Sequence, residues 1–325
     1  MIPDPSDPDR AVYIFAVNHL PHPFYDRSGA TTANQPAVSS PPKAQSQLEL
    51  FHHTLGSTTI THLRSISHPL IQTPNDIHAL SPTSLYLTND HHYRSGALRQ
   101  IEDLFPIARW SNVLHLNLTS LTTSSPSSNL TVTPALTSLH NLNGLGHNSL
   151  SPSEVVLTSA GSGILYLAQP ISPSANDFNL SIKSTIEIPS TLDNPSFFSD
   201  TLTNGSYILA GLLRASDFLS NTRDPNSEMV KDPVVVWSVT KRDPRLISKS
   251  NKNSNPEWEK KILWQDDGST IRSGTTAVLV GDDNDVASSF RTDTRKGGGG
   301  WLFVTGCLSK SIIAFRIEDI KQSLS

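Results

Sequence analysis

The chain has 325 residues, enough to bury one large core or to divide into two domains. Hydrophobic residues make up 36%, and serine, threonine, asparagine and proline are abundant, which is typical of short strands joined by polar turns rather than of a helical protein. The formal net charge of −4 is small for this length and argues against a nucleic-acid-binding protein.

Apolar segments rich in β-branched and aromatic residues recur along the chain, and they fall into five pairs. In chain order the pairs are 12–17 with 48–51, 85–87 with 113–116, 155–157 with 164–167, 207–210 with 234–237, and 301–304 with 312–315. A further short extended segment precedes each pair after the first, at 76–80, 143–145, 193–197 and 273–278. The chain therefore predicts a repeated unit of several strands.

Repeats of two to four strands, with a period of roughly 40–50 residues plus insertions, are typical of a β-propeller. The longest predicted loops are the Ser/Thr-rich stretch 119–140 and the one that ends at 297–300. No long segment has helical periodicity, which argues against an α/β fold. A β-sandwich is the structural alternative.

Polar residues stand where the first strand of three repeats begins. They are Asn75 with Asp76, Asn143, and Asp193 with Asn194. The first strand of each propeller blade lines the central channel, so these side chains would converge. Calcium takes about six to eight oxygen ligands in tolerant geometry, whereas no His or Cys spacing supports a tetrahedral zinc site. The same residues are also ordinary turn formers.

Other features bear on compartment and surface. Cys307 is the only cysteine, which excludes an intrachain disulfide, and its apolar surroundings predict a small core residue. The basic tract 241–261 is interrupted by acidic residues and proline, which predicts a solvated loop. Sequons mildly favour a secretory route. They occur at Asn117, Asn129, Asn179 and Asn204.

No apolar run approaches membrane-spanning length. The apolar stretch 11–17 near the N-terminus is too short for a signal peptide. We therefore expect either a cytosolic protein or a chain whose true beginning is missing.

Several short segments together resemble the serum paraoxonase/arylesterase family of calcium-dependent lactonases and esterases. They are residues 16–19, 74–77, 87–91, 110–111, 143–145 and 192–194. They occur in the family's order and run through most of the chain, and 273–276 and 302–315 continue the likeness. The resemblance implies an all-β, six-bladed β-propeller with two calcium ions in its channel, one catalytic and one structural.

The resemblance also assigns roles to residues. Asn75, Asn143, Asp193 and Asn194 would be ligands of the catalytic calcium, and Asp76 a ligand of the structural one. His19 matches the second histidine of the family's proposed His pair. His91, with Asp90, matches residues that line the active-site wall. We therefore group His19, His91 and Asp90 as candidate catalytic residues.

Some family features cannot be placed here. They are the opening strand with its Glu-Asp pair, the first histidine of the pair, the disulfide, and a later histidine whose position is taken by Leu213. We therefore expect residues 1–325 to form a single calcium-binding propeller domain that lacks the family's N-terminal strands. Its first blade and both calcium sites would be incomplete.

The resemblance implies a hydrolase of aryl esters or lactones, in which calcium polarises the carbonyl and an activated water attacks. No Gly-x-Ser-x-Gly motif supports a serine-hydrolase mechanism. The full-length form would be secreted or lumenal, and its partner a small ester or lactone rather than nucleic acid or membrane. The alternatives are a degenerate, non-catalytic propeller that binds calcium and a partner, and a gluconolactonase-like propeller, whose metal-binding Glu cannot be placed.

Overall fold

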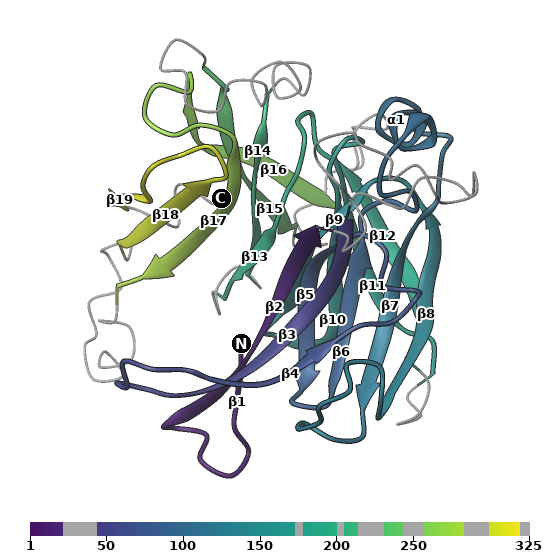
Figure 1. The fold of residues 1–325 in the computed structure, drawn as a ribbon. Helices are drawn as coiled ribbons and strands as arrows, with labels where there is room; N and C mark the ends of the chain where they lie inside the picture. Colours follow the sequence, from purple (N-terminus) through teal and green to yellow (C-terminus); the bar gives the residue numbers. More distant parts are fainter. Residues whose placement is uncertain are drawn as a thin grey trace. The chain divides into compact units, whose positions relative to one another are not determined.

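The computed structural model describes residues 1–21, 44–172, 178–199, 205–213, 231–242, 257–282 and 299–318. In these ranges the chain is almost entirely β-strand, and the one described helix, α1 (Ala97–Leu104), has 8 residues (Figure 1). The strands form five sheets, each built from strands that follow one another along the chain. The prediction of an all-β protein is confirmed.

Four sheets have four strands and the last has three. The first contains β1 (Ile2–Pro3), β2 (Ala11–Pro21), β3 (Ala44–Thr54) and β4 (Thr61–Ile66). The second contains β5 (Pro74–Ser81), β6 (Ser84–Asn89), β7 (Ser111–Leu118) and β8 (Leu130–Leu139). The third contains β9 (Leu142–Asn148), β10 (Ser151–Ser159), β11 (Ile164–Pro170) and β12 (Leu180–Glu187). The fourth contains β13 (Pro195–Phe198), β14 (Ser206–Leu212), β15 (Val234–Lys241) and β16 (Trp258–Asp266), and the fifth β17 (Gly274–Gly281), β18 (Gly300–Gly306) and β19 (Ile313–Ile317).

All five predicted strand pairs are confirmed as antiparallel neighbours. They are β2 with β3, β6 with β7, β10 with β11, β14 with β15, and β18 with β19. The four predicted entry segments form β5, β9, β13 and β17, the first strand of each later sheet. Consecutive sheets of this kind have the strand order of propeller blades. Six blades with an incomplete first one are not confirmed, because the described residues form five sheets and the first has four strands.

The predicted loop at 119–140 is partly wrong, because β8 occupies its second half. Its threonines favour extended structure, and Leu130 and Val132 pack against the core while the other side of the strand faces solvent. Pro134 is tolerated because β8 is the last strand of its sheet. The basic tract 241–261 is also not one loop: β15 ends at Lys241, β16 begins at Trp258, and 243–256 lie outside the described residues.

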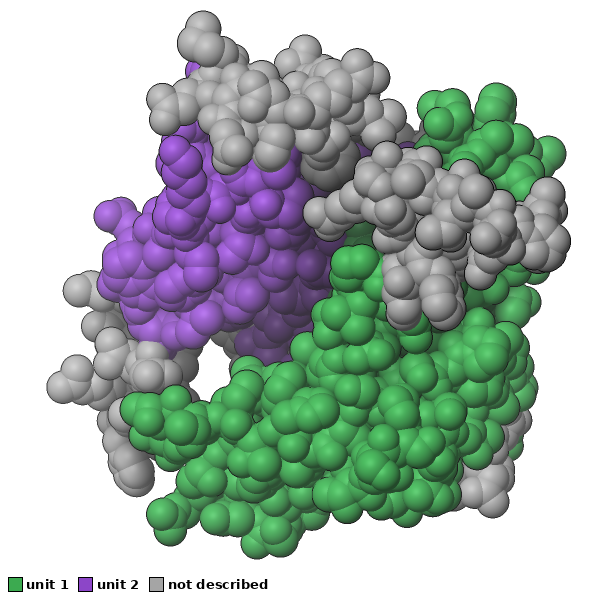
Figure 2. All heavy atoms as spheres, viewed as in Figure 1, with its two compact units in different colours: residues 1–145, 170–181 green, residues 146–169, 182–325 purple. Residues whose placement is uncertain are grey.

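The chain divides into two compact units, drawn in green and purple in Figure 2. The first comprises residues 1–145 and 170–181, and the second 146–169 and 182–325. Alternating side chains of the central strands build a core in each. In the first unit that core includes Leu48, Leu50, Leu85, Leu87, Leu114 and Leu116, which are all at most 1% exposed. In the second unit two clusters lie against β14 and β15.

Cys307 is exposed, so the prediction of a core residue is wrong. It directly follows Gly306, the last residue of β18. The alternation that buries Leu302 and Val304 ends with the strand, and the apolar surroundings in the sequence therefore do not extend to the thiol. Among the described residues, no helix is long and apolar enough to cross a membrane.

His115 on β7 is a buried, neutral histidine. Its ring stacks on Phe178 with 3.6 Å between centroids and 8° between planes, and its Nε2 lies 2.8 Å from Ser84 Oγ. Burial lowers the pKa of His115 to about 4. In the unfolded chain the same imidazole takes up a proton near pH 6.5, so the fold becomes less stable where only the unfolded chain is protonated.

The lowered pKa of His115 predicts how the unfolding free energy depends on pH. Because the folded-state pKa is depressed, the contribution is complete above about pH 6.5 and is lost as the pH falls toward about 4. We expect His115→Gln to reduce the loss of unfolding free energy between pH 7 and pH 4.5 by about 2 kcal/mol, measured by urea denaturation. His147→Gln, an exposed position, is the control and should leave the pH dependence unchanged; equal slopes in both variants would contradict the prediction.

Candidate functional site

Asp76 lies at an irregular point of the second sheet. The register between β5 and β6 shifts between Pro74 and Ile77, so Asn75 and Asp76 stand outside the regular ladder. Such bulges redirect side chains and are frequent beside functional sites. The backbone N–H of Asp76 donates to Thr88 Oγ1 at 3.0 Å, while the Asn75 side chain is exposed.

Among the described residues, the carboxylate of Asp76 accepts hydrogen bonds from backbone N–H groups alone. Oδ1 accepts from Ile77 N and Oδ2 from Leu145 N, both at 2.7 Å. Burial raises the pKa of Asp76, and these two hydrogen bonds only partly oppose the effect. Within the described residues no cationic side chain pairs with it. A desolvated carboxylate without a countercharge is costly unless a cation binds.

The backbone of Asn143 is linked to the backbone of Asp76 through a shared threonine. Thr88 accepts the Asp76 N–H and donates its own hydroxyl proton to the backbone oxygen of Asn143 at 2.7 Å. The side-chain Oδ1 of Asn143 is buried and has no hydrogen-bond partner in the described part of the chain. A buried acceptor without a partner is rare in folded proteins and calls for an explanation.

The donor set suits a hard cation rather than a transition metal. In the described ranges no group of three or more His, Cys, Asp and Glu could hold a metal ion. A carboxylate and an amide oxygen are the ligand types that calcium prefers. Asp76 and Asn143 therefore fit part of a calcium site, and the remaining ligands stay predictions.

Asn89 and Thr73 stabilise the turn that leads into β5. The Oδ1 of buried Asn89 accepts from Gln72 N at 3.0 Å and Thr73 N at 3.1 Å, and its Nδ2 donates to Leu70 O at 2.9 Å. Fully satisfied buried amides of this kind stiffen the backbone around them. Asn89 is thus a supporting residue of the Asn75 and Asp76 bulge.

Asp193 and Asn194 lie in the second unit, directly before β13. The backbone oxygen of Asp193 accepts the hydroxyl proton of Thr158 at 2.7 Å. Asn194 Nδ2 donates to Thr276 Oγ1 at 3.1 Å and its N–H to Thr275 O at 2.9 Å. The backbone at both residues is therefore ordered, and their assignment as calcium ligands stays a prediction.

The two threonine contacts repeat one arrangement. Thr88 on β6 donates to Asn143, and Thr158 on β10 donates to Asp193. In each case the second strand of one sheet holds the candidate ligand that opens the next sheet. Both threonines follow a leucine, in Leu87-Thr88 and Leu157-Thr158, and this repeated dipeptide is the sequence signal that could have identified them.

His19 lies near the end of β2, and its side chain is exposed. Its Nδ1 is 2.9 Å from Ser46 Oγ on β3. Within the described residues no hydrogen bond or ion pair joins His19 to Asn75, Asp76 or Asn143. Its assignment as a proton-transfer residue stays a prediction.

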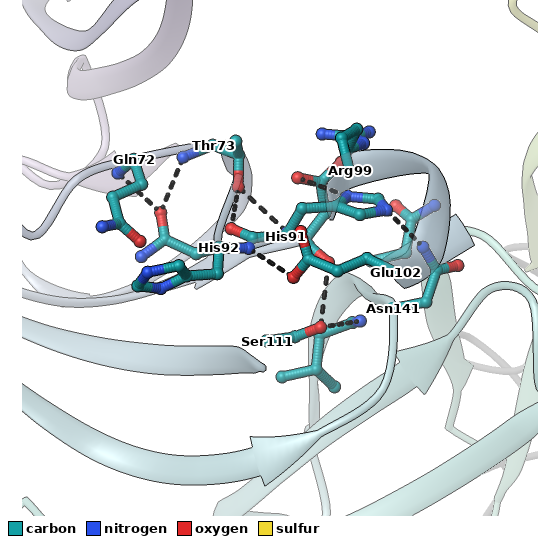
Figure 3. Close-up of polar contacts among 12 residues, drawn as sticks. Gln72, Thr73, His91, His92, Arg99, Glu102, Ser111 and Asn141 are labelled. Carbon is teal, nitrogen blue, oxygen red and sulfur yellow. Dashed lines mark hydrogen bonds and ion pairs between the residues drawn. The ribbon is translucent and has the colours of Figure 1, made fainter. Parts of the chain in front are cut away.

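Asp90 and His91 belong to a polar network after β6 (Figure 3). His91 is buried, with Nδ1 3.0 Å from Asp90 Oδ1 and Nε2 2.8 Å from Asp103 Oδ1. Asn141 Nδ2 lies 3.0 Å from the same Nε2. Glu102 accepts from the N–H groups of His92 and Tyr93 at 2.7 and 2.9 Å. Helix α1, which carries Glu102 and Asp103, is thereby attached to this turn.

Sequence similarity points to one family. Residues 21–125 match the family model described as Arylesterase. A curated relative, serum paraoxonase/arylesterase 2 of Gallus gallus, is 27% identical over 195 residues, which is 60% of this chain and 44% of that protein. Serum paraoxonase/arylesterase 1 of Mus musculus is 31% identical over 110 residues, which is 34% of this chain and 24% of that protein. The chain thus matches less than half the length of these relatives.

Solved structures are more distant. A luciferin-regenerating enzyme is 15% identical with a TM-score of 0.36, covering 88% of this chain and 80% of that one. A putative 6-phosphogluconolactonase from Bacteroides uniformis is 7% identical with a TM-score of 0.39, covering 98% and 84%. Neither likeness is close enough to transfer a function. The sequence matches, in contrast, show that part of the chain is similar to the Arylesterase family model and to serum paraoxonase/arylesterase proteins.

Proposed function

We propose that the chain is part of a calcium-dependent hydrolase of aryl esters or lactones. The observation that carries the proposal is a desolvated carboxylate and a buried amide oxygen on two residues whose backbones share a threonine. Asp76 is desolvated and held only by N–H groups, and Asn143 Oδ1 is buried without a hydrogen bond among the described residues. The relatives' name, arylesterase, supports the substrate class.

The residues would divide the work as follows. Asn143 Oδ1 would help to hold the catalytic calcium and the Asp76 carboxylate the structural one, and Thr88 would fix the spacing between their backbones through its two hydrogen bonds. When bound, calcium would supply a Lewis acid that polarises the ester carbonyl. A histidine or carboxylate would help to deprotonate the attacking water, and His19, exposed at the end of β2, would orient or relay that proton. Asn75, Asp193 and Asn194 are the further oxygen ligands proposed from the resemblance.

The same proposal includes a secretory route, since the relatives are named as serum proteins. Three of the sequon asparagines have exposed side chains, so a sugar attached to them could extend into solvent. They are Asn117, Asn129 and Asn179. Asn204 lies outside the described residues.

Calcium binding and turnover should be measured on the same purified chain. We expect calcium to raise the temperature of unfolding and to be required for hydrolysis of phenyl acetate or a lactone, with a chelator abolishing both effects. Magnesium is the control cation, because its small size demands near-octahedral geometry.

The outcomes separate the two functional classes. Calcium binding together with chelator-sensitive turnover would support the hydrolase. Calcium binding without turnover of either substrate would favour the non-catalytic propeller that binds calcium and a partner. If neither the temperature of unfolding nor the turnover changes with calcium or with chelator, the proposal is contradicted.

A further inference from the structure

Both ring nitrogens of His91 face a carboxylate, which a neutral imidazole cannot satisfy. Nδ1 is 3.0 Å from Asp90 Oδ1, and Nε2 is 2.8 Å from Asp103 Oδ1. A neutral imidazole has one N–H, so it donates to only one of two acceptors. In that form, a nitrogen lone pair would face a carboxylate oxygen on the other side.

The Asp90 side offers no alternative partner. His91 Nδ1 and Asp90 Oδ1 are both buried, and neither makes a hydrogen bond in the described part of the chain, so their contact has the distance of an ion pair without hydrogen-bond geometry. Two unprotonated atoms would therefore oppose one another at 3.0 Å without solvent. A proton on Nδ1 turns this contact into an attractive ion pair.

The Asp103 side requires the second proton. Nε2 and Asp103 Oδ1 are at hydrogen-bond distance, 2.8 Å. The Asn141 amide lies 3.0 Å from Nε2 through its Nδ2, and it fits a protonated ring once its oxygen and nitrogen are exchanged by a flip, which hardly changes the shape of the group.

The charges around the ring are unbalanced without an imidazolium. Arg99 is the one cationic side chain that lies between the two carboxylates, 3.7 Å from Asp90 and 3.6 Å from Asp103. Burial raises the pKa of Asp90, but hydrogen bonding and charge from His91, with Arg99 and Thr73, lower it below its usual value. A charged His91 would add a second cation beside Arg99 between the two carboxyl groups.

The remaining neighbours do not supply that charge. On α1, the carboxyl group of Glu102 accepts from the N–H groups of His92 and Tyr93. Before β9, the ring of His140 contacts the backbone oxygen of Glu102 at 2.8 Å. Thr73 and Ser111, from the turn before β5 and from β7, are neutral and contact backbone oxygens of His91 and Asp90.

We propose that His91 is a doubly protonated imidazolium that fastens α1 to the end of β6, so that the attachment of this helix depends on pH. An isolated helix of 8 residues is unstable in water, and its attachment therefore depends on contacts such as those of Glu102 and Asp103. His91 is then a positioning residue, because an imidazolium with both nitrogens engaged has no lone pair with which to accept a proton. The inference does not depend on whether the chain hydrolyses esters.

Two measurements test the proposal on the full chain. With 15N-labelled histidine, we expect NMR to show both nitrogens of His91 protonated at pH 6.5. Hydrogen exchange should show protection of the α1 amides, corrected for intrinsic rates, that decreases as the pH is raised and His91 loses a proton. In His91→Gln the protection of the α1 amides should be lower by a factor of at least about ten at pH 6.5. It should also no longer depend on pH.

The control is His92→Gln, because the neighbouring ring is exposed and contributes only its backbone N–H to the network. It should leave α1 protection unchanged. If His91→Gln does not fold, Asp103→Asn removes one carboxylate with little change in shape, and a larger fraction of His91 should then be unprotonated at the same pH. A His91 nitrogen that is unprotonated at pH 6.5, unchanged protection in His91→Gln, or unchanged His91 protonation in Asp103→Asn would each overturn the proposal.

Discussion

Replacing Asp76 by asparagine is expected to abolish the stabilisation of the chain by calcium and to reduce calcium-dependent ester hydrolysis at least a hundredfold. The carboxylate is the one formally charged oxygen ligand proposed in the first unit, and it lies in a desolvated position where its attraction for a cation is strong. At calcium concentrations about 100 times the dissociation constant, the wild-type chain should gain about 2.7 kcal/mol of unfolding free energy. The variant should gain almost none.

The unfolding free energy of the calcium-free Asp76→Asn variant shows whether the substitution acts through calcium binding or through the fold itself. Burial raises the pKa of Asp76, so the ionised side chain destabilises the folded state at neutral pH. The amide removes that charge but can no longer accept equally well from both Ile77 and Leu145, and we expect the calcium-free variant to lie within about 1 kcal/mol of wild type. Asp9→Asn, an exposed position, is the matched control. A calcium response in Asp76→Asn equal to that of the control would refute the assignment.

Among the substitutions considered, Arg64→Met is expected to lower the unfolding free energy the most. Arg64 is 1% exposed and donates to three backbone oxygens of the connection between β7 and β8. Nη1 reaches Ser120 O at 2.8 Å, and Nη2 reaches Ser128 O at 2.9 Å and Pro126 O at 3.2 Å. Methionine keeps most of the apolar stem but no donor. We expect a loss of about 3–5 kcal/mol in unfolding free energy, since the three carbonyls would lose the donors of Arg64, although Pro126 O would keep the N–H of Ser67.

Urea denaturation of three variants distinguishes the causes. Arg64→Lys should lose less than Arg64→Met, because an ammonium can bind one or two carbonyls but cannot match the planar guanidinium. Arg242→Met removes an exposed arginine whose Nε lies 3.8 Å from Glu259, and it should change stability by less than about 0.5 kcal/mol. Protease cleavage within 119–129 should increase in Arg64→Met alone. A loss below about 1 kcal/mol in that variant would show that the three carbonyls find other donors.

The first three strands of each sheet after the first were predictable from sequence, and the fourth strands were not. Segments such as 85–87 and 155–157 are buried on both faces, and they therefore appear as short apolar runs between polar turns. The outer strands β4, β8, β12 and β16 have a sheet neighbour on one side only and carry many Ser, Thr and Lys residues. Composition alone does not distinguish such strands from loops, which is why β8 was placed in a loop.

In the candidate site too, the sequence identified residues from their local surroundings but not residues whose role depends on a distant partner. Asp76 and Asn143 were identified because each stands directly before or at the start of an apolar strand. Thr88 was not assigned a role, since its importance comes from a partner 55 residues away in the next sheet. The carboxylates of α1 were also missed, because a helix of 8 residues leaves too short a periodic pattern to recognise.

The repeated threonine contacts have a consequence for how such proteins can be recombined. The hydroxyl that positions Asn143 comes from β6 and the one that positions Asp193 comes from β10, so each candidate ligand is placed by the sheet that precedes its own. An exchange of whole sheets between homologues would transfer a ligand without the group that orients it. Functional segments of this chain are therefore offset from its structural repeats, and a transplant that preserves the site should begin at the second strand of one sheet and end after the first strand of the next.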